Sequence, residues 1–481
     1  MVGRFRQLGV VLTPAEVQDE GVDRVLDNIV RAGATAISPT LGVYALGKPG
    51  EGSREPPLDV SGEARLLDRP LWGHRELWLR GYTPHPHDPT IWADVPYAPP
   101  PVAPPDLRTD VVRAIIGGAR ARGLAVEIQI SPYTLPGAPG GQTFGGGHGT
   151  GALSDRPRRI DGSTGERIVA GHGCLNHPSV RALGRARLRE ALRHYPDVDG
   201  IFVDWTEYTT YFLEDCFACF CDHCRAAATQ QGYDWERIER DTRALWERLH
   251  RLTAADIARA ADPADWPFVL ATALVEHPGV ADLLRFKAAS VRATATELRQ
   301  TMNAAGASGV ALGLNGFAPP WSRITGMDYG SVHDVVQATR CKLFTFHWPM
   351  MTRWWSETLL AWNPGLDEKA VLAAVQAALD LPTPPTEHRR GLADYGMPRP
   401  DEPHAITMAA LTRKVNQAVR MAGAAGQEGR CLAYVHSYRP AAEFSRVLEA
   451  VADSDAPGCW VQRYGYLSDE KLAIMREFAP R

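Results

Sequence analysis

The sequence predicts a (β/α)8 barrel, an α/β fold, because eight β-prone apolar runs alternate with helical patterns along the whole chain. Strands separated by helices pair in parallel through right-handed crossovers, and a count of eight favours a closed barrel over an open sheet. No G-x-G-x-x-G fingerprint follows the first run and the sequence contains no Walker-type loop, so an open nucleotide-binding sheet loses its usual support.

Each expected strand is rich in β-branched, aliphatic or aromatic residues and is bounded by turn-forming residues. In chain order the strands are LGVVLTP (8–14), ATAISPT (34–40), LAVEIQIS (124–131), DGIFVDW (199–205), SGVALGLN (308–315), RCKLFTFH (340–347), RCLAYVHSY (430–438) and GCWVQRYG (458–465).

The expected helices show apolar residues at spacings of three and four. The first, 18–32, carries Val22, Val25, Leu26 and Ile29 on one face and ends near Gly33. The others are expected at about 108–122, 178–195, 367–380, 404–423 and 468–478, with several more up to about 306 that are interrupted around 262–266.

We expect residues 1–481 to form a single barrel domain with long inserted loops at about 41–107, 132–172 and 206–266. The first two insertions are rich in Gly and Pro and are too long for plain connectors, which indicates functional loops.

Bulk composition excludes several classes of function. Hydrophobic residues make up 44% and charged residues 22% of the chain, and the net charge is only −4, so neither nucleic acid nor a membrane surface is an expected partner. No apolar run is long enough to span a bilayer, and the apolar stretch near the N-terminus is too short for a signal peptide. A cytoplasmic protein is expected, and the oligomeric state, including a homo-oligomer, stays open.

The chemistry of a barrel lies at the C-terminal ends of its strands. Asp204 and Glu207, at and just beyond the end of the fourth strand, are the acidic pair at a strand end, and glycosidic cleavage needs two carboxyl groups. Three residues apart on a continuing strand they would face opposite ways, so both enter the site only if the strand ends at about Trp205. A loop-capping Asp204 and a solvated Glu207 are the structural alternative.

Aromatic and hydrogen-bonding residues at the other strand ends suit a polyhydroxylated ligand such as a carbohydrate. The expected substrate-binding residues are Trp205, Tyr208, Asn315, His347, Trp348, His436, Tyr438, Arg463 and Tyr464. If the second carboxylate comes from elsewhere, the candidates are Glu127, which would need a partner inside the barrel, and Glu276, Asp328, Asp334, Glu387 and Asp394.

The segment CFACFCDHC places thiols at Cys216, Cys219, Cys221 and Cys224. Close spacing of this kind can surround one tetrahedral ion, with the fourth ligand from Cys216 or from elsewhere, and zinc is the natural ion for thiolates without a redox role. Such a closed site is structural. The alternative is a set of free, partly buried thiols. No organic cofactor is expected.

Three stretches, CLNHPSVRALGRARLREAL (174–192), YPDVDGIFVDWTEY (195–208) and CFCDHC (219–224), resemble the zinc-containing β-galactosidases of glycoside hydrolase family 42. They are even more similar to uncharacterised bacterial glycoside-hydrolase-like barrels with Cys-x-Asn-x-Pro, Asp-Gly-Ile-x-x-Asp and Cys-Phe-Cys-x-x-Cys elements. The resemblance covers about a tenth of the chain. It implies a zinc ion held by Cys219, Cys221 and Cys224, with Cys174 as the fourth ligand.

The same resemblance places Glu207-Tyr208 where those galactosidases carry an Asn-Glu-Tyr acid/base. Here Thr206 replaces the Asn, and His436 stands where they place a nucleophilic Glu. In fucosidase-like barrels the Asp of the fourth strand is the nucleophile, and that pattern makes Asp204 the attacking group and Glu207 the proton donor.

The leading hypothesis is therefore a glycosidase that retains the anomeric configuration through Asp204 and Glu207. A sugar isomerase or lyase, and a carbohydrate-binding barrel without catalysis, are the alternatives. The sugar, the linkage and the anomer stay open.

Overall fold

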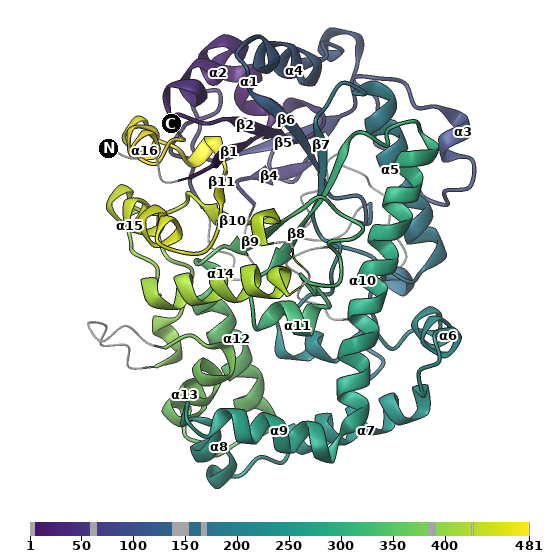
Figure 1. Cartoon of the computed structure of the whole chain (residues 1–481), viewed down its shortest axis with the longest axis vertical. Coiled ribbons are helices and arrows are strands. Elements are labelled where there is room, and N and C mark those ends of the chain that lie inside the picture. Colours follow the sequence, from purple (N-terminus) through teal and green to yellow (C-terminus); the bar gives the residue numbers. More distant parts are fainter. Residues whose placement is uncertain are drawn as a thin grey trace.

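The computed structural model describes residues 5–57, 65–136, 153–164, 171–382, 391–424, 426 and 428–480. Its fold class is the predicted one, because eight parallel strands close a barrel in the order β1-β11-β10-β9-β8-β7-β6-β2 (Figure 1). The strands are β1 (Gln7–Leu12), β2 (Ala36–Pro39), β6 (Ala125–Ile130), β7 (Gly200–Val203), β8 (Ala311–Phe317), β9 (Ala338–Leu343), β10 (Cys431–His436) and β11 (Gly458–Gln462).

The described helices cover the barrel and extend below it in Figure 1. They are α1 (Pro14–Glu20), α2 (Val22–Arg31), α3 (Pro89–Trp92), α4 (Val111–Ala121), α5 (Pro178–His194), α6 (Asp222–Gln230), α7 (Trp235–Leu249), α8 (Ala254–Ala260), α9 (Trp266–Glu276), α10 (Pro278–Ala304), α11 (Trp321–Thr325), α12 (His347–Trp362), α13 (Glu368–Leu379), α14 (Met408–Gly423), α15 (Ala441–Ala452) and α16 (Asp469–Arg476). The single helix expected at 18–32 is two helices, because Gly21 breaks it with a φ of 86° that glycine tolerates.

Two of the strand ends, those of β9 and β11, lie furthest before the predicted boundary. Strand β9 stops at Leu343, and His347, expected at the end of this strand, begins helix α12. The apolar run that continues to residue 347 hides this boundary, although Pro349 fits the first turn of a helix, where no N–H is needed. Strand β11 stops at Gln462, so Tyr464 lies in a short 3-10 turn and not on the strand.

The barrel interior is filled by large side chains around one buried ion pair. The Arg340 guanidinium lies between the rings of Phe202 and Trp460, at 3.4 and 3.5 Å from their centroids. It also pairs with Glu127 at 2.5 Å, so Glu127 has the partner that its position in the barrel demands. Glycines on the strands make room for these rings.

Replacing Gly313 in β8 by alanine is expected to destabilise the fold by about 1–3 kcal/mol, because the added Cβ would lie 2.3 Å from the Phe202 ring. Denaturant unfolding measures this loss. Gly309→Ala is the matched control, since nothing lies within 4 Å of its added carbon. Equal unfolding midpoints for the two variants would contradict the packing that we describe.

The insertions contain secondary structure of their own. The segment 41–107 includes a three-stranded antiparallel sheet in the order β3 (Val43–Gly47), β5 (Leu77–Tyr82) and β4 (Ser53–Glu55), which the sequence pattern did not predict. Within 206–266, helix α7 packs against α10 and helix α8 against α13, which makes the helical layer at the bottom of Figure 1. Of 132–172, residues 137–152 and 165–170 lie outside the described residues.

Candidate active site

The chain leaves β7 at Val203, and the turn that follows decides where the two predicted catalytic carboxylates point. The Asp204 N–H still donates to the Ile130 carbonyl at 2.8 Å. Trp205 then has a φ of 60°, a left-handed conformation that is uncommon for a large side chain. This turn ends the alternation of side chains along the strand, and Asp204 and Glu207 approach the same group from β9.

That group is the ammonium of Lys342, a residue that the sequence pattern did not single out. Its Nζ lies 2.6 Å from Asp204 Oδ1 and 3.6 Å from Glu207 Oε1. The two oxygens are therefore separated by no more than the sum of these distances, about 6 Å. A lysine inside an apolar strand was the available signal, because a buried cation needs a carboxylate partner.

The charge of Lys342 is maintained by its two neighbours. Burial alone would lower the pKa of Lys342, but the carboxylates of Asp204 and Glu207 outweigh it, and the pKa is raised. The ammonium consequently stays protonated and cannot act as an amine nucleophile in this arrangement.

Glu207 is enclosed by protein. Its side chain has no exposed surface, its oxygens accept the Phe317 N–H at 3.0 and 3.1 Å, and Thr325 Oγ1 donates to Oε2 at 2.7 Å. Burial raises the pKa of Glu207 to about 7, although Lys342 and these hydrogen bonds act in the opposite direction. Asp204 differs, since its side chain keeps 14% of its surface exposed. The two carboxyl groups thus occupy unlike environments.

Aromatic rings lie next to the group formed by Asp204, Glu207 and Lys342. Lys342 Nζ lies 4.4 Å from the centre of the Trp205 ring, and the His172 ring stacks on Trp205 at 6.0 Å. Tyr211 follows at 6.1 Å from Trp205, and the His347 ring lies 5.0 Å from Tyr211. Of these rings, the strand-end pattern predicted Trp205 and His347, whereas His172 and Tyr211 come from loops whose course it does not define.

The predicted residues at the end of β10 lie next to these aromatic rings. His436 is the last residue of β10, and its Nδ1 accepts the Tyr438 N–H at 3.0 Å. Burial lowers the pKa of His436 well below its ordinary value, and the charges of Arg65 and Arg439 add to the effect. The Tyr438 hydroxyl donates to the Pro398 carbonyl at 3.1 Å. His436 is therefore a neutral, buried ring in the protein without ligand.

The two residues predicted after β11, Arg463 and Tyr464, interact with acids other than Asp204 and Glu207. Arg463 donates to Glu55 and forms an ion pair with Glu16 at 3.5 Å. The Tyr464 hydroxyl donates to Glu20 in α1 at 3.0 Å. Arg463 thus joins the inserted sheet to the barrel, and Tyr464 points toward the outer helices.

Three further predicted residues, Asn315, Trp348 and Tyr208, have partners other than Asp204 and Glu207. Asn315 donates to Gln129 Oε1 inside the barrel at 3.1 Å. The Trp348 ring packs 5.5 Å from Trp321. Tyr208 lies against the cysteine cluster described below. Among the other acids considered, Glu276, Asp328 and Asp334 each pair with an arginine, and Glu387 lies outside the described residues.

Four buried cysteines form a compact cluster. Three of them follow β7 in the chain, and the fourth precedes α5. The ligand atoms of Cys174, Cys219, Cys221 and Cys224 all lie within 4.8 Å of one another, and Cys174 Sγ is 3.4–3.7 Å from the other three. Cys216 stands outside, with its Sγ 3.3 Å from Thr210 Oγ1. The fourth member is therefore Cys174 and not Cys216, and the four thiols are placed to hold a metal ion.

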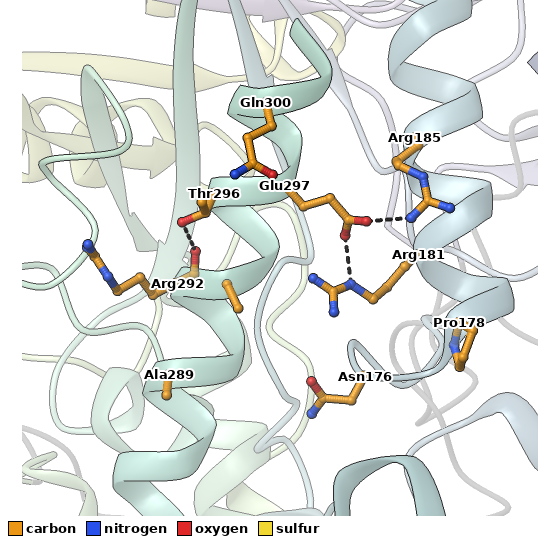
Figure 2. A pocket seen from close by; sticks show the side chains of 10 residues that line it. Asn176, Pro178, Arg181, Arg185, Ala289, Arg292, Thr296, Glu297 and Gln300 are labelled. Carbon is orange, nitrogen blue, oxygen red and sulfur yellow. Dashed lines mark hydrogen bonds and ion pairs between the residues drawn. The ribbon is translucent and has the colours of Figure 1, made fainter. Parts of the chain in front are cut away.

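A groove of about 600 Å³ lies on the outer side of the barrel between α5 and α10 (Figure 2). Arg181 and Arg185 point from α5 toward Glu297 on α10 and pair with it. Because one carboxylate already binds both arginines, and no strand end contributes to the lining, this groove does not belong to the predicted site.

Neither a protein-family model nor a curated protein sequence matches the chain. Among solved structures, the catalytic domain of β-amylase from Paenibacillus polymyxa is similar, with 10% identity, a TM-score of 0.51 and coverage of 99% of this chain and 98% of that one. A β-galactosidase from the Antarctic haloarchaeon Halorubrum lacusprofundi has 12% identity and a TM-score of 0.49, and the match covers 98% of this chain and 58% of that one. The likeness to β-amylase shows the fold: this chain shares its barrel with a glycoside hydrolase.

No helix in the described parts of the chain combines the length and the apolar character that a membrane span requires.

Proposed function

We propose that this protein hydrolyses a glycosidic bond at the C-terminal end of its barrel, using Asp204 and Glu207. The observation that carries the proposal is their shared contact with Lys342, which keeps the two carboxylate oxygens within about 6 Å of each other. Retaining glycosidases hold their two carboxyl groups about 5–5.5 Å apart, and inverting enzymes hold them about 6.5–9.5 Å apart. This separation supports a retaining mechanism.

In this mechanism the partly exposed carboxylate of Asp204, which pairs with Lys342, attacks the anomeric carbon. Glu207, whose pKa of about 7 leaves it largely protonated in mildly acidic solution, gives its proton to the departing oxygen. Because the Glu207 side chain is fully buried, this step requires the turn after β7 to move and admit that oxygen. Water then cleaves the ester between Asp204 and the sugar, and Glu207 recovers a proton from that water.

The test is the release of chromophore from a panel of aryl glycosides. Asp204→Asn is expected to lower the rate by about a thousandfold and Glu207→Gln by about a hundredfold, because each removes a group that acts in the transition state. Glu276→Gln, a change at a half-exposed surface acid, is the control and should keep the full rate. A cleaved glycoside whose rate survives Asp204→Asn would overturn the assignment.

A carbohydrate-binding barrel without catalysis is the second candidate. The complete burial of Glu207 and the hydrogen bonds to both its oxygens favour it, because a structural carboxylate is expected to be satisfied in this way. In that case sugars raise the melting temperature of the protein, no aryl glycoside is cleaved, and Glu207→Gln leaves the affinity for sugar unchanged.

We further propose that the cysteine cluster binds Zn²⁺. With Zn–S bonds of about 2.3 Å, a tetrahedral ion holds its sulfur atoms about 3.8 Å apart, close to the distances from Cys174. Four thiolates close the coordination sphere, so the ion would tie the loop after β7 to the start of α5 and not activate water. Reduced thiols of this kind suit a cytoplasmic protein.

A further inference from the structure

A second group of polar side chains lies around the ring of Phe346, which follows β9. The Arg65 guanidinium lies 5.2 Å from the centre of this ring, and the rings of His436, Tyr438 and His404 lie 4.8, 5.9 and 6.1 Å from it. We call these residues, together with Arg439, the Phe346 cluster. It combines Phe346, which follows β9, with residues at and after the end of β10, with His404 from the segment before α14, and with one arginine from the inserted segment 41–107.

The hydrogen bonds within the cluster leave donors without acceptors. Thr345 Oγ1 accepts from Arg439 Nη2 at 2.7 Å and lies 2.7 Å from His404 Nδ1. If the hydroxyl donates its own proton to Nδ1, the proton of neutral His404 is on Nε2. In the described parts of the chain His404 Nε2, Arg439 Nη1 and Arg65 Nε have no hydrogen-bond partner, and these residues are only 2%, 1% and 8% exposed. Arg439 Nη1 lies 3.7 Å from Glu443 Oε2, and the Tyr438 backbone contacts the His404 ring. Arg65 Nε is therefore the buried donor that still requires an acceptor.

The charged residues near the Phe346 cluster also indicate a site for an anion. Arg463 pairs with Glu16 and Glu55, Lys471 pairs with Asp68, and Arg439 lies 3.7 Å from Glu443. Arg65 has no carboxylate at ion-pair distance among the described residues. A buried guanidinium without a counter-ion is costly, so an anion placed here would be stabilised.

The cluster adjoins the candidate active site. His347 lies 4.1 Å from Phe346 on one side and 5.0 Å from Tyr211 on the other, and Tyr211 lies 6.1 Å from Trp205. One unbroken row of rings therefore leads from the cluster to the residue after Asp204.

We propose that the Phe346 cluster binds the anionic group of an acidic sugar, a carboxylate or a sulfate ester, through Arg65, Arg439 and His404. This inference rests on the proposed function, whose substrate class it narrows to glycosides of uronic acids or of sulfated sugars. Planar guanidinium groups suit both oxyanions, because they donate two parallel hydrogen bonds.

Calorimetric binding tests the proposal without turnover. The probes are D-glucose, D-galactose, the corresponding uronates and their 6-sulfates. At least one acidic sugar is expected to bind about tenfold or more tightly than its neutral counterpart, as charged hydrogen bonds produce. Whether a uronate or a sulfate shows the preference decides which oxyanion is bound.

Arg65→Met is expected to abolish that preference, and Arg65→Lys, which keeps the charge, should retain part of it. Arg80→Met is the matched control, because Arg80 lies in the same insertion and is exposed. Melting temperatures of all variants establish that each is folded. Equal affinities for acidic and neutral sugars, no binding of any acidic sugar at millimolar concentration, or a preference that survives Arg65→Met would overturn the proposal.

The outcome is separable from that of the proposed function. Arg65-dependent binding of an acidic sugar without cleavage of any aryl glycoside would support the subsite and count against hydrolysis. Cleavage of a neutral glycoside that depends on Asp204, with no preference for acidic sugars, would support hydrolysis and overturn the subsite.

Discussion

Replacing Cys219 by serine is expected to release the zinc that we propose for this cluster and to lower the free energy of unfolding by on the order of 5 kcal/mol, the range in which loss of a structural metal lies. Cys219 comes from the loop after β7, whereas Cys174 precedes α5, so an ion in the proposed site would join segments far apart in sequence. Without it, the remaining thiols are buried close together with no ion to bind them. Zinc content by atomic absorption and thermal unfolding measure the two effects.

Cys216→Ser is the matched control for that prediction. Cys216 belongs to the same segment and is partly buried, but its Sγ contacts Thr210 and not the cluster. The variant should retain one equivalent of zinc and most of its thermal stability. If purified protein contains no metal, or if the two serine variants lose the same stability, the structural role of the cluster is wrong.

Lys342→Met is expected to destabilise the fold by about 3 kcal/mol or more, because it leaves Asp204 and Glu207 with no cation between them. Glu207 is fully buried, so its charge would be uncompensated, and its proton would be held more strongly than now. Denaturant unfolding at neutral pH measures the loss. The destabilisation should be largest above the raised pKa of Glu207 in the variant and should diminish as the pH falls toward about 7, because below that pH Glu207 is largely neutral in both proteins.

The triple variant Lys342→Met, Asp204→Asn, Glu207→Gln should recover much of this stability, since removing all charges costs less than removing one partner. Arg353→Met is the control at the surface, where the ion pair with Glu357 is half-exposed and its loss should cost less than about 1 kcal/mol. A Lys342→Met protein as stable as the wild type would show that the three charged groups do not interact as described.

The fold class and most elements were readable because their signals are local. Eight apolar runs with intervening helical periodicity indicate a barrel independently of the loop conformations. The observed strands lie near the predicted ranges. The boundaries at Leu343 and Gln462 could not be predicted, because aromatic residues continue beyond each strand, at 344 and 346 and at 464 and 466. The inserted sheet escaped prediction since Pro- and Gly-rich segments carry weak strand signals.

The candidate site was likewise predicted only in part. Asp204 and Glu207 were identified by their place after an apolar run, and the thiol cluster by its spacing. His172, Tyr211 and Lys342 were not, because their proximity depends on loops and on the closure of the barrel. Arg463 and Tyr464 follow a strand end as predicted, yet the acids on β4 and α1 that bind them come from segments that no local pattern connects to them.

By itself, the sequence determined the parallel barrel, the carboxylates after the fourth strand and a group of thiols suited to a metal. Those features depend on periodicity and spacing, which are properties of neighbouring residues. Only the tertiary structure decided that Cys174 completes the cluster, that Lys342 brings two carboxylates together, and that Arg65 reaches Phe346. Such contacts join residues from separate segments, and the barrel must close before they exist.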